Sequence, residues 1–290
     1  MNMFDSTSNI FLNGWREYRK KIVSIRFFSV VVLMAALVCA IATGIDRFMI
    51  DKQEWITPWM APHFFNNKFF VTFYGFIVCY MYSDVPFMNR SELYYVLRKG
   101  RRVWCAEKIF AIIMEAFTLT LITYIASVVV FIPMLQLQTD WGKVIHTLAY
   151  SNNLWEYNII GNPSAVIIAK YSPLQAMSIC FVMVWLVSSV IGILMFGISL
   201  YWNRVAAISA AVIVTGLNMS EGNYITSAWL PYLTPFNWCR IGLHGETIFL
   251  DSYYPSLYVC LGLCCALLIC GIIAIMKKAG HIEFVWNKEE

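Results

Sequence analysis

The sequence predicts an all-α membrane protein that crosses the bilayer several times. Hydrophobic residues make up 60% of its 290 residues, charged residues only 13%, and the mean hydropathy is +0.64. A soluble domain is about 45–50% apolar and about 25% charged. This composition excludes a soluble enzyme. The formal net charge of +4 is modest, and we predict no binding of nucleic acid.

The apolar runs predict six membrane spans within a single transmembrane domain, residues 1–290. A window of about 20 apolar residues is long enough to cross the hydrocarbon core. The fifth window is the shortest, because Gly216 and Asn218 interrupt its end. The predicted spans cover residues 27–45, 64–83, 106–134, 174–201, 205–218 and 256–276, and two large outer segments cover residues 135–173 and 219–255.

The distribution of basic residues predicts that both termini lie in the cytoplasm. With that orientation, 15 of the 21 Lys and Arg residues fall on the cytoplasmic side, as the positive-inside rule requires. We expect no removable signal peptide, because no small-residue cleavage site follows the first basic cluster. The predicted location is therefore a cell membrane, with a multi-pass chain.

An amphipathic helix is predicted ahead of the first span, over residues 8–26. Trp15, Tyr18, Ile22 and Ile25 recur at helical spacing, whereas basic residues occupy the other faces. This pattern is typical of a helix that lies in the membrane interface and binds membrane lipid.

A second short helix is predicted over residues 89–100, between the second and third spans. Asn89 can cap its first turn, Glu92 completes the spacing of a capping box, and Gly100 provides the stop. Two kinds of side chain make it a candidate contact surface. They are the apolar or aromatic Leu93, Tyr94, Val96 and Leu97 and the basic Arg98, Arg101 and Arg102. The alternative is an interfacial helix whose arginines bind lipid phosphates.

Glu115 is an ionisable residue in the third span, roughly 12 Å deeper than Glu107 at about 1.5 Å per residue. A charge at that depth needs a partner or a watery cavity. In a functional role, Glu115 would belong to a translocation path or link to the cytoplasmic helix over residues 89–100. In a structural role, it would pair with a hydroxyl group, a tyrosine or a neighbouring span, or it would stay protonated. We predict no basic residue at this level in another span.

The segment from Ala228 to Trp238 is too apolar for a free loop and too rich in proline for a spanning helix. Such backbone is tolerated at membrane depth only where protein buries it or water lines it. We predict either an outer gate or an interfacial aromatic belt. The residues concerned are Trp229, Pro231, Tyr232, Pro235 and Phe236.

Motifs for catalysis or metal binding are absent from the sequence. The four histidines are scattered, no GxSxG elbow occurs, and Gly142-Lys143 is followed by Val144 where a phosphate loop needs Ser or Thr. Most of the nine cysteines fall in apolar runs without a CxxC pair. We predict no enzyme, no metal and no cofactor on this chain.

The order of these parts resembles the permease subunit of a type 2 ATP-binding-cassette (ABC) transporter of the exporter-like class. The resemblance is concentrated in two segments, Arg90 to Lys108 and Leu230 to Phe236, and includes a tight turn at Trp202-Asn203-Arg204. It implies that the 89–100 helix is a coupling helix on a separate nucleotide-binding ATPase subunit, which holds ATP and Mg. It also implies a second permease chain, identical or related, and a bacterial cell membrane.

Three function classes follow. The leading hypothesis is ATP-driven export of a peptide or amphipathic small molecule. The second is a membrane scaffold or sensor that transports nothing and whose cytoplasmic helix binds lipid. The third is an intramembrane enzyme acting through Glu115 or Asp84, which we disfavour because no second reactive group is predicted near either residue.

Overall fold

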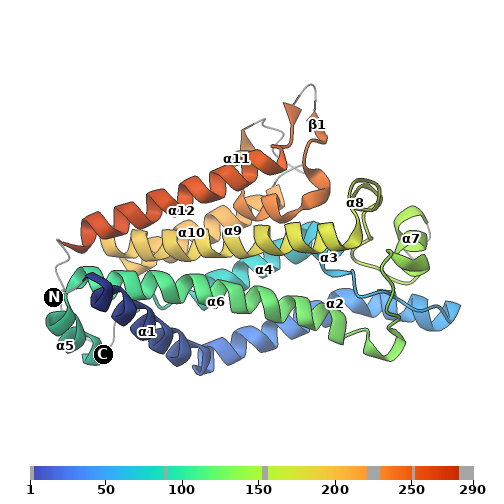
Figure 1. The fold of residues 1–290 in the computed structure, drawn as a ribbon. Helices are drawn as coiled ribbons and strands as arrows, with labels where there is room; N and C mark the ends of the chain where they lie inside the picture. Colours follow the sequence, from blue (N-terminus) through green and yellow to red (C-terminus); the bar gives the residue numbers. More distant parts are fainter. Residues whose placement is uncertain (1–2, 88–89, 152–155, 221–228, 250–251, 281–290) are drawn as a thin grey trace.

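The computed structural model describes residues 3–87, 90–151, 156–220, 229–249 and 252–280. Most of the described chain forms an elongated helical bundle (Figure 1). We refer to its two ends as the α5 end and the α7 end, after the short helices α5 (Arg90–Lys99) and α7 (Gly142–Tyr150) found there. The bundle consists of α2 (Ile25–Lys52), α4 (Lys68–Met81), α6 (Arg101–Val129), α9 (Pro173–Tyr201), α10 (Arg204–Ser220) and α12 (Leu257–Ala279).

Shorter elements surround this bundle, together with the N-terminal helix α1 (Met3–Ile22). They are α3 (Ala61–Asn66), η1 (Ile132–Met134), α8 (Ala165–Lys170), α11 (Leu230–Leu233), η2 (Pro235–Cys239), η3 (Ile241–Leu243) and the hairpin of β1 (Thr247–Phe249) and β2 (Ser252–Tyr253).

Local sequence explains where several helices begin and end. Ser24 has an extended backbone, and its hydroxyl accepts a hydrogen bond from the Phe27 amide at 3.2 Å, so α2 starts afresh after α1. The predicted amphipathic helix 8–26 is therefore wrong at its C-terminal boundary, and Ile25 belongs to α2. Gly100 separates α5 from α6 with a φ of +91°, which favours glycine.

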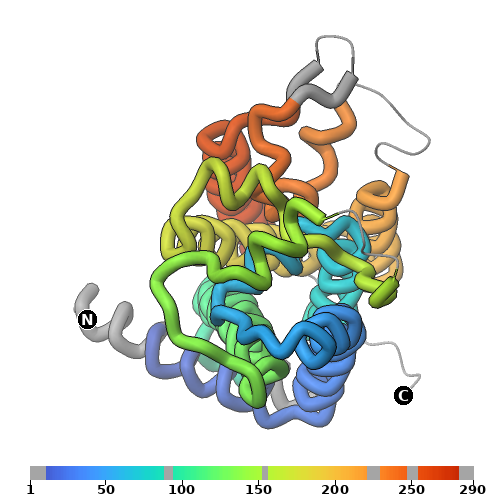
Figure 2. Tube along the Cα trace, turned by 90° about the vertical axis from the view of Figure 1, so that its right-hand side faces the viewer, coloured from blue at the N-terminus to red at the C-terminus, as the bar shows by residue number. Residues whose placement is uncertain are grey.

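The central helix of the bundle is α9, which packs against α4, α6, α10 and α12. Figure 2 looks along the bundle from the α7 end and shows α1 on the outside of the bundle, beside α6. Close approach between α9 and α6 depends on Gly192. A Cβ atom there would lie 2.6 Å from Cγ2 of Ile112 and 2.8 Å from the Tyr82 ring.

Four described helices, α2, α6, α9 and α12, are long and apolar enough to cross a membrane, which indicates a membrane protein. The other two predicted spans correspond to α4 and α10, with 14 and 17 residues. At about 1.5 Å per residue these are shorter than a hydrocarbon core of about 30 Å. The predicted count of six spans is therefore not confirmed.

The predicted second span, 64–83, is interrupted at Asn67. The backbone there is extended, with ψ at 126°, and the side chain accepts a hydrogen bond from the Phe70 amide at 3.0 Å. Its amide nitrogen donates to the Ile160 carbonyl at 2.9 Å. One continuous helix was the wrong prediction, because an asparagine side chain can compete with the helical backbone for hydrogen bonds. The third span is shifted as well, and α6 runs from Arg101 to Val129.

The two predicted outer segments cover the α7 end. In the first, Trp141 is buried, and its carbonyl accepts a hydrogen bond from the Thr57 hydroxyl at 2.7 Å. In the second, the buried His244 ring lies between two backbone carbonyls, with Nδ1 2.9 Å from Pro255 O and Nε2 3.1 Å from Trp238 O. These contacts join irregular backbone segments to one another.

We expect Gly192→Ala to destabilise the protein, because the new methyl group would push α9 away from α6. Overpacking of this kind costs about 1–3 kcal/mol, more than the roughly 1 kcal/mol that alanine gains in a helix. Thermal unfolding of the purified protein in detergent measures the effect. Gly262→Ala on α12 is the matched control, because nothing lies within 4 Å of its new Cβ. An unchanged midpoint for Gly192→Ala would contradict the proposed close contact.

Candidate functional site

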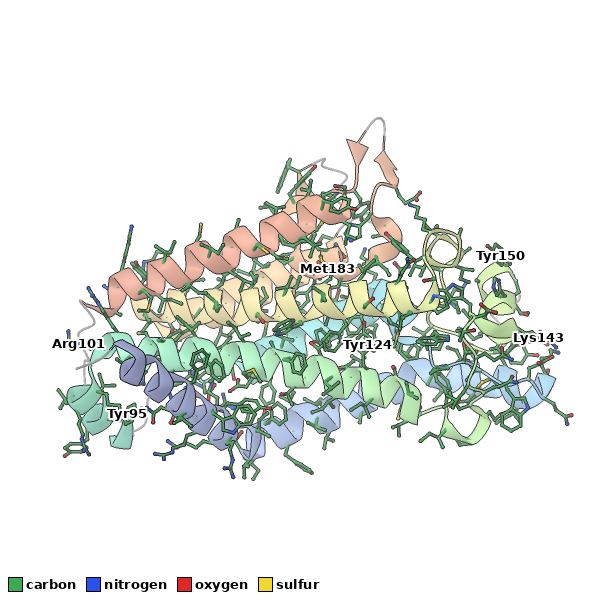
Figure 3. All side chains as sticks on the ribbon, viewed as in Figure 1. Tyr95, Arg101, Tyr124, Lys143, Tyr150 and Met183 are labelled. Atoms are coloured by element: carbon green, nitrogen blue, oxygen red, sulfur yellow. The ribbon has the colours of Figure 1, made fainter. Side chains whose placement is uncertain are left out.

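The surface of α5 is the first part of the candidate site. Tyr94 and Leu97 are 78% and 74% exposed, although both are large and hydrophobic. Arg98 is exposed one residue later, and Arg101 and Arg102 are exposed at the start of α6. Figure 3 shows Arg101 at the α5 end, opposite Lys143 and Tyr150 at the α7 end. A compact surface of apolar and basic side chains is thus available to a partner at one end of the bundle.

The predicted contact residues do not all belong to this surface. Val96 is only 2% exposed and packs into the chain itself, so its assignment as a contact residue was wrong. The pattern of Leu93, Val96 and Leu97 left open which side of the helix faces its own protein. Asn89 lies outside the described residues, and so do the side chains of Glu92 and Leu93.

A hydrogen bond fastens α5 to α6. The Tyr95 hydroxyl donates to the Glu107 carboxylate, whose oxygens lie 2.8 and 2.7 Å away. The Lys99 ammonium lies 4.8 Å from the centre of the Tyr95 ring. With Val96 buried beside it, Tyr95 fixes the inner side of α5 and leaves Tyr94 and Leu97 pointing outward. Tyr95 is labelled in Figure 3.

The next residue of α6 binds α1. Lys108, whose side chain is 2% exposed, lies 2.7 Å from Oε2 of Glu17, and Lys20 lies 2.6 Å from its Oε1. Burial alone would raise the pKa of Glu17, but the charges and hydrogen bonds of Lys108 and Lys20 outweigh it and lower the pKa to about 2. Glu17 is therefore ionised and bound from both sides.

A second ion pair joins the two helices farther along α6. Lys21 of α1 lies 3.2 Å from Oε1 of the buried Glu115, and its ammonium is also 3.2 Å from the centre of the Phe87 ring. We predicted no basic residue at the level of Glu115 in another span, and the basic partner comes instead from the N-terminal helix α1. The structural interpretation of Glu115 as a paired group is the one the geometry favours.

Asp84 is brought to the same place, which the sequence did not predict. Nη1 of Arg26 lies 3.2 Å from Oδ1 of Asp84. A small cavity of about 20 Å³ is lined by several residues, among them Lys21, Arg26, Asp84 and Glu115. A cavity of that size holds about one water molecule. The two carboxylates thus each have a cation beside them, and no space for a substrate is present between them. We refer to Glu17, Lys21, Arg26, Asp84, Lys108 and Glu115 as the charged junction.

The charged junction was missed by sequence reasoning as a unit. The sequence pattern placed the whole helix in the membrane interface and did not indicate which of its residues pack on the bundle. In the structure the stripe that packs on α6 is Gly14, Glu17, Tyr18 and Lys21, and Tyr18 shares a hydrogen bond of 2.6 Å with Thr118. One sequence feature could have indicated this charged contact surface: Glu17 is an acidic residue within a basic stretch, four residues from Lys21 on the same side of the helix.

The predicted outer gate residues lie in or directly next to α11 and η2, and Figure 1 shows α11 on the side of the bundle opposite α1. Pro231, Pro235 and Phe236 are buried, whereas Trp229 and Tyr232 are partly exposed. The Phe236 ring lies 6.4 Å from that of Tyr74 on α4, and Trp238 donates a hydrogen bond to the Pro231 carbonyl at 2.7 Å. The segment forms short helical turns packed on α4 and α9, so its irregular backbone is buried by protein.

Among the described residues, no group of three or more His, Cys, Asp or Glu side chains could hold a metal ion. No protein-family model matches the chain, and no curated protein and no solved structure matches it.

The low pKa of Glu17 predicts a pH dependence of stability. Its contribution is fully present above the ordinary value of 4.5 and is lost as the pH falls from there toward about 2. We expect the free energy of unfolding to fall more steeply between about pH 5 and about pH 3 in the wild type than in Glu17→Gln. Glu156→Gln, which alters an exposed carboxylate, should keep the wild-type slope. Equal slopes for Glu17→Gln and wild type would contradict the assignment.

A double-mutant cycle tests the pair of Lys21 and Glu115. Removal of one partner leaves a buried charge unpaired, so Lys21→Met and Glu115→Gln should each lower the free energy of unfolding by about 3 kcal/mol. The double variant should lose less than the sum of the two. Chemical unfolding in detergent measures the three values. The pair of Lys143 and Glu54, 3.7 Å apart and exposed, is the control and should give a coupling below about 1 kcal/mol. Additive costs for Lys21 and Glu115 would show that they do not interact.

Proposed function

We propose that this chain is the permease subunit of an ATP-driven exporter of the type 2 ABC class. In this proposal a separate ATPase subunit, which holds ATP and Mg, docks on α5, and a second permease chain completes the transporter. The chain itself hydrolyses nothing. Its membrane is that of a bacterial cell, and both termini lie in the cytoplasm. The cargo is a peptide or an amphipathic small molecule.

The observation that carries this proposal is the two-sided construction of α5. Tyr94 and Leu97 face outward with three arginines beside them, whereas Tyr95 and Val96 hold the opposite side of the helix to α6. Exposed aromatic and apolar residues together with arginine are typical of the centres of protein interfaces. A helix serving only as a lipid anchor would not need to be clamped to the end of a long helix.

The contacts of α6 support a mechanical role for α5. Glu107 binds α5 and the adjacent Lys108 binds α1, so a displacement of α5 acts on both helices at neighbouring positions. The helix α6 continues from there for the length of the bundle and packs on α9. Closure of an ATPase pair beneath α5 would tilt α6 and α9 as rigid bodies, and the outer segment with Trp229, Tyr232 and Phe236 would respond as the gate.

We expect Tyr94→Ala combined with Leu97→Ala to abolish association with the ATPase while leaving stability within about 0.5 kcal/mol of wild type, because both side chains are exposed. The measurement is co-purification of the tagged chain with an ATP-binding subunit from its own host, with and without a nucleotide analogue. Reversal of the charges of Arg98, Arg101 and Arg102 should weaken the same association.

Leu137→Ala is the matched control for this experiment. Leu137 is 82% exposed near the α7 end, so its loss removes an exposed apolar side chain away from the proposed interface. Its association with the ATPase should equal that of the wild type. If the wild-type chain never associates with an ATP-binding protein, the proposed function is wrong.

A further inference from the structure

Helix α1 carries a second surface, on the side not used for binding α6. Trp15 is 47% exposed and Val23 85%, and beside them Arg16, Arg19 and Lys20 are exposed as well. Apolar and basic side chains that share the exposed side of a helix are typical of a helix at a membrane surface. The packing of α1 on α6 therefore leaves this surface facing away from the bundle.

These side chains line a shallow groove at the C-terminal end of α1. It has a volume of about 330 Å³ and is lined by Trp15, Arg16, Arg19, Lys20 and Val23. Trp15 and Arg19 are four residues apart, as are Arg16 and Lys20, so these four side chains form one strip along α1, and Val23 extends it just past the end of the helix. The groove thus combines three cationic groups with an aromatic and an aliphatic wall.

Positive charge in this groove is only partly neutralised by the residues that the structure describes. The guanidinium groups of Arg16 and Arg19 make no hydrogen bond or ion pair with any of them. Lys20 binds Glu17, but that carboxylate is also bound by Lys108, so two ammonium groups share one negative charge. An anion is the ligand that this arrangement favours, and a guanidinium can bind a phosphate through two parallel hydrogen bonds.

We propose that the groove binds the phosphate of an anionic phospholipid. The surface continues from Val23 onto the start of α2, where Ile25 and Phe28 are 89% and 68% exposed and a candidate membrane span begins. An acyl chain attached to a phosphate in the groove would lie along these side chains. Free inorganic phosphate would not use them, and an acidic protein would not fit a surface that runs into the lipid-facing side of a span. Lipid binding here does not require an ATPase partner, so the two proposals can fail separately.

The purified full-length chain in a neutral detergent provides the test. Phosphatidylglycerol, phosphatidylcholine and inorganic phosphate are each titrated, and the midpoint of thermal unfolding is followed, because a ligand that binds the folded state raises it. Phosphatidylglycerol should raise the midpoint and the other two should not. For Arg16→Gln combined with Arg19→Gln, the apparent dissociation constant of phosphatidylglycerol should increase on the order of tenfold or more.

Two further variants separate lipid binding from general charge and from folding. Lys52→Gln combined with Lys143→Gln removes two exposed positive charges that lie on or beside α7. This control should leave the apparent dissociation constant of phosphatidylglycerol unchanged. Arg16→Lys combined with Arg19→Lys should retain most of the affinity. The proposal is overturned if the glutamine variant binds phosphatidylglycerol as the wild type does, if it binds no worse than the lysine variant, or if phosphatidylcholine or phosphate stabilises the protein equally.

Discussion

The arrangement of the α5 end depends on the ion pairs between α1 and α6. Lys108 and Glu115 are almost fully buried, and each meets its counter-charge from α1, at 2.7 Å for Glu17 and 3.2 Å for Lys21. Charges withdrawn from water are tolerated only when they are paired. The pairing therefore dictates both the position of α1 along α6 and its rotation. The same rotation turns the apolar and arginine side chains of α1 outward.

The contacts at the start of α6 also explain how distant segments of the chain are connected. Tyr95 binds Glu107 and Glu17 binds Lys108, so two consecutive residues of α6 hold α5 on one side and α1 on the other. From this point α6 runs along α9, which it approaches closely at Gly192. A force applied to α5 would reach the centre of the bundle through hydrogen-bonded and closely packed elements, and no flexible linker intervenes.

Much of the helical framework could be predicted from the sequence, because apolar runs and turn residues act locally. The helix over 89–100 appears as α5 at Arg90–Lys99, and Gly100 ends it as predicted. The interruption at Asn67 was missed, because it depends on a side chain that caps α4 and also binds the Ile160 carbonyl across the fold. The length of α4 was overestimated for a similar reason, because hydropathy measures apolar character and not helical continuity.

The sequence by itself determined the membrane character of the protein, its main helices and the position of a short basic helix between two of them. These properties follow from composition and from neighbours a few residues apart. Only the tertiary structure decided that Val96 faces inward, that Lys21 neutralises Glu115 and that Asp84 joins them. Lys21 and Glu115 are 94 positions apart in the chain, and Arg26 and Asp84 are 58 apart. Helical periodicity shows which residues share a face, but which face meets which neighbour is chosen by the packing and charge balance of the whole bundle.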